Sequence, residues 1–98
     1  MSKKISLVLI HAEWCQPCKV MVPTMNKIMS KKEFNNIPFK LIDADNDTND
    51  YSTKYNIRNI PSLLILDEKE NLIQKITGAV PEFKVIEELR DAINTDEE

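Results

Sequence analysis

A short and almost continuous apolar run at residues 5–10 restricts the possible folds of this chain more than any other segment. Only Ser6 interrupts the aliphatic side chains, so the run does not alternate between a buried and a solvent-facing side. A run of this length and composition is typical of a strand covered on both faces, inside a parallel or mixed sheet with helices on each side. The sequence therefore predicts an α/β protein with residues 5–10 as its central strand.

The rest of the chain alternates between helical and strand patterns. Apolar residues recur at helical spacing from residue 15 to residue 30, and a polar turn at 45–50 precedes a short predicted helix at 51–55. Further strands are predicted at residues 39–43, 62–66 and 72–77. The predicted order is βαβαββα, a four-stranded mixed sheet flanked by three helices. Its first two strands are expected to be parallel and its last two to form an antiparallel hairpin.

The last predicted helix follows Pro81, a residue that suits the first turn of a helix. Phe83, Ile86, Leu89 and Ile93 are spaced to form its apolar face. The acidic tail at residues 95–98 is expected to be frayed. With 98 residues, the chain is expected to form a single domain, 1–98.

Composition and charge argue against several classes of protein. The chain is 42% hydrophobic and 30% charged, which is ordinary for a globular protein. Its net charge is −3 and its basic residues are scattered, so no surface for nucleic acid is predicted. No stretch approaches the roughly 18 apolar residues of a membrane span, so no membrane partner is expected.

The beginning of the chain resembles a signal peptide only in part. Lys3 and Lys4 precede the apolar run, but the run is short, Glu13 follows it and no clear cleavage site is present. Cleavage there would also remove the predicted central strand. We therefore expect a cytoplasmic protein, with export as the alternative.

The chain has two cysteines, Cys15 and Cys18, separated by two residues. A disulfide between them closes too short a loop to restrict the unfolded chain much, which favours a chemical role over a structural one. Half of a zinc site is one alternative, but zinc usually takes four ligands and His11 is the only histidine. A pair of inert buried thiols is another, although the polar and proline residues between the cysteines argue against it. We expect no metal site.

The position of the pair indicates how it would react. If Cys15 begins the helix, its sulfur lies beside N–H groups that lack intrahelical partners, where the helix dipole favours negative charge. A thiol with a pKa of about 8.5 is only a few per cent ionised at pH 7, whereas a pKa of about 7 ionises half of it. Cys15 would attack a substrate disulfide and Cys18 would resolve the mixed disulfide. Pro17 lacks an N–H and fits the first helical turn.

Four blocks of the sequence resemble the thioredoxin family. Residues 12–19, which contain Trp14-Cys15-Gln16-Pro17-Cys18, are similar to its active-site motif. Pro23 falls where the family has a helix-kinking proline, residues 54–62 resemble the stretch leading to its cis-proline, and residues 77–79 resemble the segment with its active-site glycine. A CxxC motif alone is weak evidence. Together the blocks occur in order at family-like spacings over most of residues 5–93.

The resemblance implies that Cys15 is the nucleophile and Cys18 the resolving thiol of a redox disulfide. Pro61 would be cis and lie against the pair, with a trans turn proline as the alternative. Ile60 would offer its backbone to an extended segment of the substrate. Trp14, Ile60, Gly78 and Ala79 would form the rim of an apolar docking surface. Trp14 could instead be surface packing, and Gly78, the only glycine, could also serve a turn that needs positive φ.

The sequence departs from the family pattern in four respects. Only fourteen residues precede Cys15, which leaves room for one strand. The family has a further strand and helix before that strand, so this chain is closer in size to a glutaredoxin. One edge of the sheet is then expected to be less covered.

Leu9 occupies the position of a buried aspartate that handles the proton of the resolving cysteine, which predicts slower resolution or a different pH dependence. Gln16 replaces the usual glycine between the cysteines and would adjust the balance of dithiol and disulfide. His11 stands where the family has an aromatic residue, and could tune Cys15 or simply pack at the solvent edge.

The function implied by the resemblance is that of a thiol–disulfide oxidoreductase which reduces protein disulfides and serves cell redox homeostasis. No bound cofactor is expected. Electrons would come indirectly from NADPH through a thioredoxin-reductase-like flavoprotein, and the chain is expected to be a monomer. Clients would be enzymes with a redox disulfide of their own, such as ribonucleotide reductase, or peroxide-handling enzymes. Two alternatives remain open: a disulfide oxidase or isomerase in an oxidising compartment, and a thioredoxin-like binding module.

Overall fold

The computed structural model describes residues 4–94, so the tail predicted at residues 95–98 lies outside the described part of the chain. Within that part, four strands and three α-helices follow one another in the predicted order. They are β1 (Ser6–His11), α1 (Gln16–Met29), β2 (Phe39–Asp43), α2 (Tyr51–Lys54), β3 (Ser62–Leu66), β4 (Leu72–Thr77) and α3 (Glu82–Ile93). The fold class is confirmed, and every strand lies within one residue of its predicted bounds.

The four strands form one mixed sheet in the order β2-β1-β3-β4. β1 pairs in parallel with β2 and antiparallel with β3, and β3 pairs antiparallel with β4. The helical crossover through α1 makes the first pair parallel, whereas the short turn between β3 and β4 makes the last pair a hairpin. The inner strands β1 and β3 are buried over almost their whole length, as their apolar runs predict.

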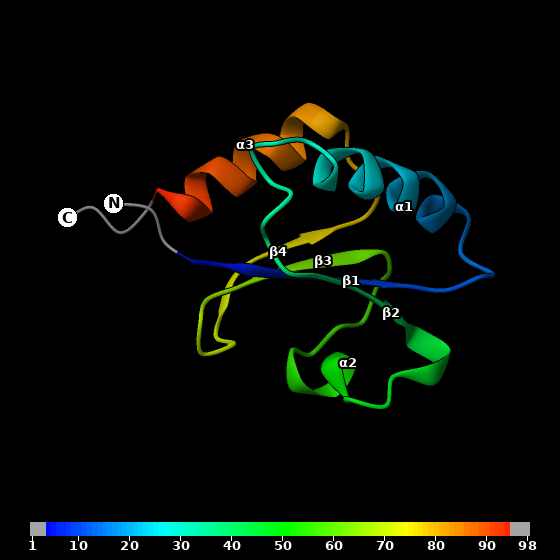
Figure 1. Ribbon diagram of the computed structural model, residues 1–98. Helices are drawn as coiled ribbons and strands as arrows, with labels where there is room; N and C mark the ends of the chain where they lie inside the picture. Colours follow the sequence, from blue (N-terminus) through cyan, green and yellow to red (C-terminus); the bar gives the residue numbers. More distant parts are fainter. Residues whose placement is uncertain (1–3, 95–98) are drawn as a thin grey trace.

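Helices cover both faces of the sheet, with α1 and α3 on one face and α2 on the other (Figure 1). Alternate residues of a strand point to opposite faces. Leu7 and Leu9 of β1 therefore belong to the core cluster formed with α1 and α3. Val8 and Ile10 belong to a second cluster, which includes Tyr51 of α2. Because both faces are buried, β1 needs apolar residues on both sides.

The apolar face predicted for α3 is wrong at Phe83, which is 71% exposed. The buried residues of α3 are Val85, Leu89 and Ala92. Phe83 stands two positions before Val85, and at 3.6 residues per turn this places it about 200° around the helix. Its side chain therefore points away from the core.

Smaller differences concern the ends of helices. Pro81 is the N-cap residue of α3 and not part of its first turn, and α2 ends at Lys54, one residue early. A short 3-10 helix, Ala44–Asn46, overlaps the start of the segment 45–50 that was expected to be only a polar turn. The N–H of Asp45 donates to Oδ1 of Asp43 at 2.9 Å, and this local bond stabilises the turn after β2.

One edge of the sheet is formed by β2, whose only strand neighbour among residues 4–94 is β1. The N–H of Leu7 donates to the carbonyl of Pro38 at 2.9 Å, so the backbone groups of Pro38 point toward β1. Backbone groups alternate in direction along a strand, and those of Phe39 and Leu41 consequently point away from the sheet. Within the described residues, no helix has the length and apolar character needed to cross a membrane.

Candidate active site

Cys15 and Cys18 form a disulfide at the start of α1. Cys15 is the N-cap residue, with an extended backbone, and Cys18 lies three residues later in the first helical turn. Their Cα atoms are 5.3 Å apart, a usual separation for a disulfide. Cys15 is 5% exposed and Cys18 is 1% exposed. Cys15 is therefore the cysteine nearer to solvent.

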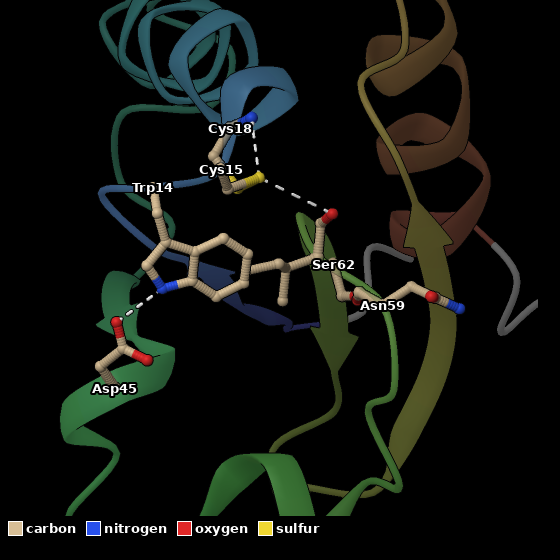
Figure 2. Close-up of a disulfide and its surroundings, with 7 residues drawn as sticks. Trp14, Cys15, Cys18, Asp45, Asn59 and Ser62 are labelled. Carbon is tan, nitrogen blue, oxygen red and sulfur yellow. Dashed lines mark hydrogen bonds between the residues drawn. A yellow bond between two sulfur atoms is a disulfide. The ribbon is translucent and has the colours of Figure 1, made fainter.

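The backbone N–H of Cys18 donates a hydrogen bond to Sγ of Cys15 at 3.2 Å (Figure 2). This is an N-cap interaction, in which the side chain before a helix accepts from an N–H of the first turn. In the dithiol form, the same N–H and the helix dipole stabilise a negative charge on this sulfur. The geometry favours the thiolate of Cys15.

The peptide bond between Ile60 and Pro61 is cis, and Pro61 is buried directly before β3. Sγ of Cys15 lies 3.8 Å from the carbonyl oxygen of Ile60 (Figure 2). A sulfur in a disulfide carries no hydrogen, so this is a contact; after reduction the Cys15 thiol can donate to that carbonyl. Ile60 also packs against the small cluster of Ala12, Cys15 and Cys18.

The end of β4 meets the same region through Gly78, whose N–H donates to the carbonyl of Pro61 at 2.8 Å. Gly78 has a φ of +91°, a value that side chains disfavour. A Cβ at this position would meet no atom within 4 Å. The glycine is therefore required by backbone conformation and not by lack of space. Ala79, the next residue, is exposed.

Trp14 precedes the cysteine pair and is 67% exposed. Its Nε1–H donates a hydrogen bond to Oδ2 of Asp45 at 2.7 Å (Figure 2). Sequence reasoning missed Asp45, because it assigned residues 45–50 only to a turn. One signal could have found it: β1 and β2 are parallel, so the loops that follow them leave the same end of the sheet. Trp14 and Asp45 lie in those two loops.

The remaining predicted site residues lie on α1 and β1. Gln16 and Pro17 follow the N-cap residue and are exposed. Leu9 has no exposed surface and lies on the face of β1 that α1 covers, so the core on this side of the cysteine pair is apolar. His11 is half-buried at the end of β1, opposite Asp43 in the strand register. Within residues 4–94, no group of three or more His, Cys, Asp or Glu side chains is arranged to hold a metal ion.

A cysteine pair at a helix N-terminus, in contact with the residue before a cis-proline that precedes β3, defines a thiol–disulfide oxidoreductase with a thioredoxin fold. The chain belongs to the thioredoxin family, because the Thioredoxin family model matches residues 1–91. It is 36% identical over 93 residues to a thioredoxin of Buchnera aphidicola from Acyrthosiphon pisum, covering 95% of this chain and 83% of the relative. A thioredoxin of Buchnera aphidicola from Baizongia pistaciae is 38% identical over 94 residues, with coverages of 95% and 79%.

Solved thioredoxin structures share the fold. The structure of the thioredoxin NaTrxh from Nicotiana alata superposes with a TM-score of 0.79 at 23% identity, over 94% of this chain and 76% of that chain. Thioredoxin from Fasciola hepatica gives a TM-score of 0.77 at 22% identity, over 92% and 82%. Family membership and the Cys15–Cys18 pair together make this chain a protein-disulfide reductase.

Proposed function

We propose that Cys15 attacks the disulfide of a protein substrate and that Cys18 resolves the resulting mixed disulfide. The observation that carries this assignment is the 3.2 Å hydrogen bond from the Cys18 N–H to Sγ of Cys15 at the start of α1. It stabilises a thiolate on Cys15 and not on Cys18, and Cys15 is also the more exposed of the two.

The proposed exchange has two balanced steps. The Cys15 thiolate bonds to one substrate sulfur and the other substrate sulfur leaves as a thiolate. Cys18, as a thiolate, then bonds to Sγ of Cys15, and the second substrate sulfur leaves. The substrate disulfide gains two electrons, and the two cysteines lose them to form the disulfide present in this structure.

The docking surface in this proposal is the rim of Trp14, Ile60, Pro61, Gly78 and Ala79. It is supported by the contact of the Ile60 carbonyl with Cys15 and by the hydrogen bond between Gly78 and Pro61, which bring three separate segments together. An extended substrate segment would pair with the backbone at Ile60. Gln16 and Pro17, exposed between the two cysteines, would adjust the relative stability of dithiol and disulfide.

Reduction of insulin disulfides in the presence of dithiothreitol tests the assignment. The wild-type chain should accelerate precipitation of insulin, and both Cys15→Ser and Cys18→Ser should lose catalysis. When the reduced variants are mixed with insulin without dithiothreitol, only Cys18→Ser should accumulate a mixed disulfide, visible as a mass increase that later addition of dithiothreitol removes. Accumulation by Cys15→Ser instead would exchange the two roles.

Thioredoxins need no bound cofactor, act on protein disulfides and are recharged by a reductase. For this chain we propose a flavoprotein reductase that uses NADPH, in the cytoplasm, with the chain acting as a monomer. The Cys15–Cys18 pair is expected to have a reduction potential near about −270 mV if this chain reduces its substrates. A potential above about −180 mV would indicate an oxidant or isomerase. A double variant, Cys15→Ser with Cys18→Ser, that keeps full function in cells would indicate a binding module instead.

A further inference from the structure

A hollow of about 360 Å³ reaches Cys18 from the side of β1 and α1. His11, Glu13, Cys18 and Lys19 contribute to its lining, together with apolar residues of α1. Cys15 and Ile60 are not part of this lining, so the hollow leads to the second cysteine and not to the proposed docking surface. Cys18 is only 1% exposed and is one of the residues that line this hollow.

Among residues 4–94, the buried core beside Cys18 contains no ionisable side chain other than Cys15 that could take its proton. Leu9 of β1 and Met21 of α1 belong to the core cluster on the face of the sheet that α1 covers. Both are apolar and have no exposed surface. Of the serine, threonine, amide and charged residues within 4–94, only Ser62 is buried, and its hydroxyl donates to the carbonyl of Asn59. Apolar surroundings disfavour the charged thiolate, so deprotonation of Cys18 needs a base close to it.

His11 lines the same hollow as Cys18. Leu7 and Leu9 point to the face that α1 covers, so the alternation along β1 turns His11 to the same face, where it lines the hollow. The imidazole has no hydrogen-bond or ion-pair partner among residues 4–94, which leaves its ring nitrogens available.

Other charged groups near the hollow are less suited to this task. Glu13 and Lys19 line it, and Asp43 lies opposite His11 on β2 with one oxygen bound to the N–H of Asp45. Glu13 and Asp43 are exposed, and a carboxylate in water is a weak base at neutral pH; an ammonium group has no lone pair with which to accept a proton. Imidazole is the side chain whose charge changes between about pH 5 and 8, so it can accept a proton from a thiol and release it again.

We propose that His11 is the proton acceptor for Cys18 in the resolution step. The neutral imidazole takes the proton of the Cys18 thiol, directly or through a water in the hollow. The Cys18 thiolate then forms the bond to Sγ of Cys15, and the substrate sulfur leaves with the electron pair of the broken bond. The imidazolium passes its proton to the departing thiolate or to water. This inference rests on the roles proposed above for the two cysteines.

Reaction of the reduced protein with 5,5′-dithiobis(2-nitrobenzoate) separates the two steps. Attack by Cys15 releases the first coloured thiolate at a rate proportional to reagent concentration. Resolution by Cys18 releases the second at a rate independent of it. In the wild type at pH 7, the second phase should be faster than a thiol without a base allows, because such a thiol is only a few per cent ionised there.

The variants His11→Gln and His11→Phe remove the base and keep, respectively, a polar or an aromatic side chain. At pH 7 both should slow the second phase about tenfold, because an unassisted thiol is only a few per cent ionised there. The first phase should change less than twofold. Glu13→Gln and Lys19→Gln are the matched controls and should leave the rate of the second phase unchanged.

Two results would overturn the proposal: an unchanged second phase in both His11 variants, or an equal slowing of both phases, which would place the effect on Cys15. Failure of the cysteine roles has a different signature. Either the wild type releases only one equivalent, or Cys18→Ser still releases two. Circular dichroism of each His11 variant establishes that its fold is retained, and the unchanged first phase shows that Cys15 remains in place.

Discussion

The indole of Trp14 and the carboxylate of Asp45 are joined by a 2.7 Å hydrogen bond, although both residues are exposed. The bond ties the loop before the cysteine pair to the 3-10 helix after β2. It therefore fixes the position of the largest side chain on the proposed docking rim.

Substitution Asp45→Ala should release Trp14 while leaving the cysteine pair intact. A hydrogen bond to a charged group contributes about 1.5–3 kcal/mol, and at this exposed position we expect about 0.5–1 kcal/mol, or a two- to fivefold higher KM for a protein substrate. The fluorescence anisotropy of Trp14, the only tryptophan, should fall. Asp45→Asn keeps an acceptor and should retain most of the anisotropy; equal loss in both variants would show that the charge matters more than the bond.

Substitution Leu9→Asp places a carboxyl group in a fully buried position. We expect a loss of about 3–5 kcal/mol in the free energy of unfolding at pH 7, from the lost apolar packing and the unpaired charge. Burial raises the pKa of a carboxyl group, so the loss should be smaller at pH 5, where the neutral form is more populated. Leu9→Asn, which does not titrate, should show no such pH dependence in urea unfolding.

The same Leu9→Asp variant tests the proton route of Cys18. A carboxylate on the buried side of the pair supplies a second acceptor, so the pH profile of resolution should change from that of the wild type. The two-phase release of the coloured thiolate measures it. An identical rate and profile would contradict the prediction that Leu9 sets the present behaviour.

Substitution Gly78→Ala should cost about 1–2 kcal/mol of stability, because the backbone there has a φ of +91°. Gly78→Asn should cost less, since asparagine tolerates positive φ better than alanine. Thermal unfolding of the three proteins gives the comparison. No atom lies within 4 Å of the added Cβ, so equal costs for both variants would indicate a clash that this geometry excludes.

Asp47 should make part of the stability depend on acid pH. Its carboxylate accepts the N–H groups of Tyr51 and Ser52 at 3.0 and 2.7 Å. Partial burial raises the pKa of Asp47, but the hydrogen bonds from Ser52 and Tyr51 outweigh it and hold the pKa below the ordinary value of 3.8. A carboxylate with a lowered pKa stabilises the fold above its unfolded-state pKa, and this contribution is lost as pH falls through the folded-state value.

The variant Asp47→Ala should therefore lose about 1 kcal/mol at pH 7 and progressively less below about pH 4. Urea unfolding across that range measures the difference. Asp50→Asn is the matched control, because the Asp50 side chain makes no capping hydrogen bond to α2, and its effect should not vary in the same way. A constant difference for Asp47→Ala at all pH values would contradict the prediction.

Phe83 and Leu89 are both large apolar residues of α3, but only Leu89 is buried. Leu89→Ala should cost about 2–5 kcal/mol through the cavity that it leaves. Phe83→Ser should change the free energy of unfolding by less than about 0.5 kcal/mol, as is usual for surface substitutions. Chemical denaturation of both variants checks this; a large loss for Phe83→Ser would mean that its ring packs on the core.

The sequence predicted the strands well because each has a compact apolar run or a turn at its end. It failed at Phe83, because Phe83 fits an apolar helical face together with Ile86, Leu89 and Ile93. Val85 belongs to a different face of the same helix, and which of the two is buried depends on the side that meets the sheet. That choice is decided by packing and not by local pattern.

The site was predictable where its residues are adjacent in the chain, as Trp14 to Cys18 are. Asp45 could not be singled out from several acidic residues in its segment, because its partner Trp14 is 31 positions away. The hollow that joins His11 to Cys18 depends likewise on side-chain volumes at several positions of β1 and α1.

The disulfide spans three positions of one helical turn, so it encloses almost no chain. Opening such a small ring releases little conformational freedom, and the sheet and the other helices are held by contacts that do not involve it. Distant surfaces such as α3 therefore have the same structure whether or not the two sulfurs are joined. A partner that distinguishes the dithiol form from the disulfide form has to contact the few atoms around Cys15.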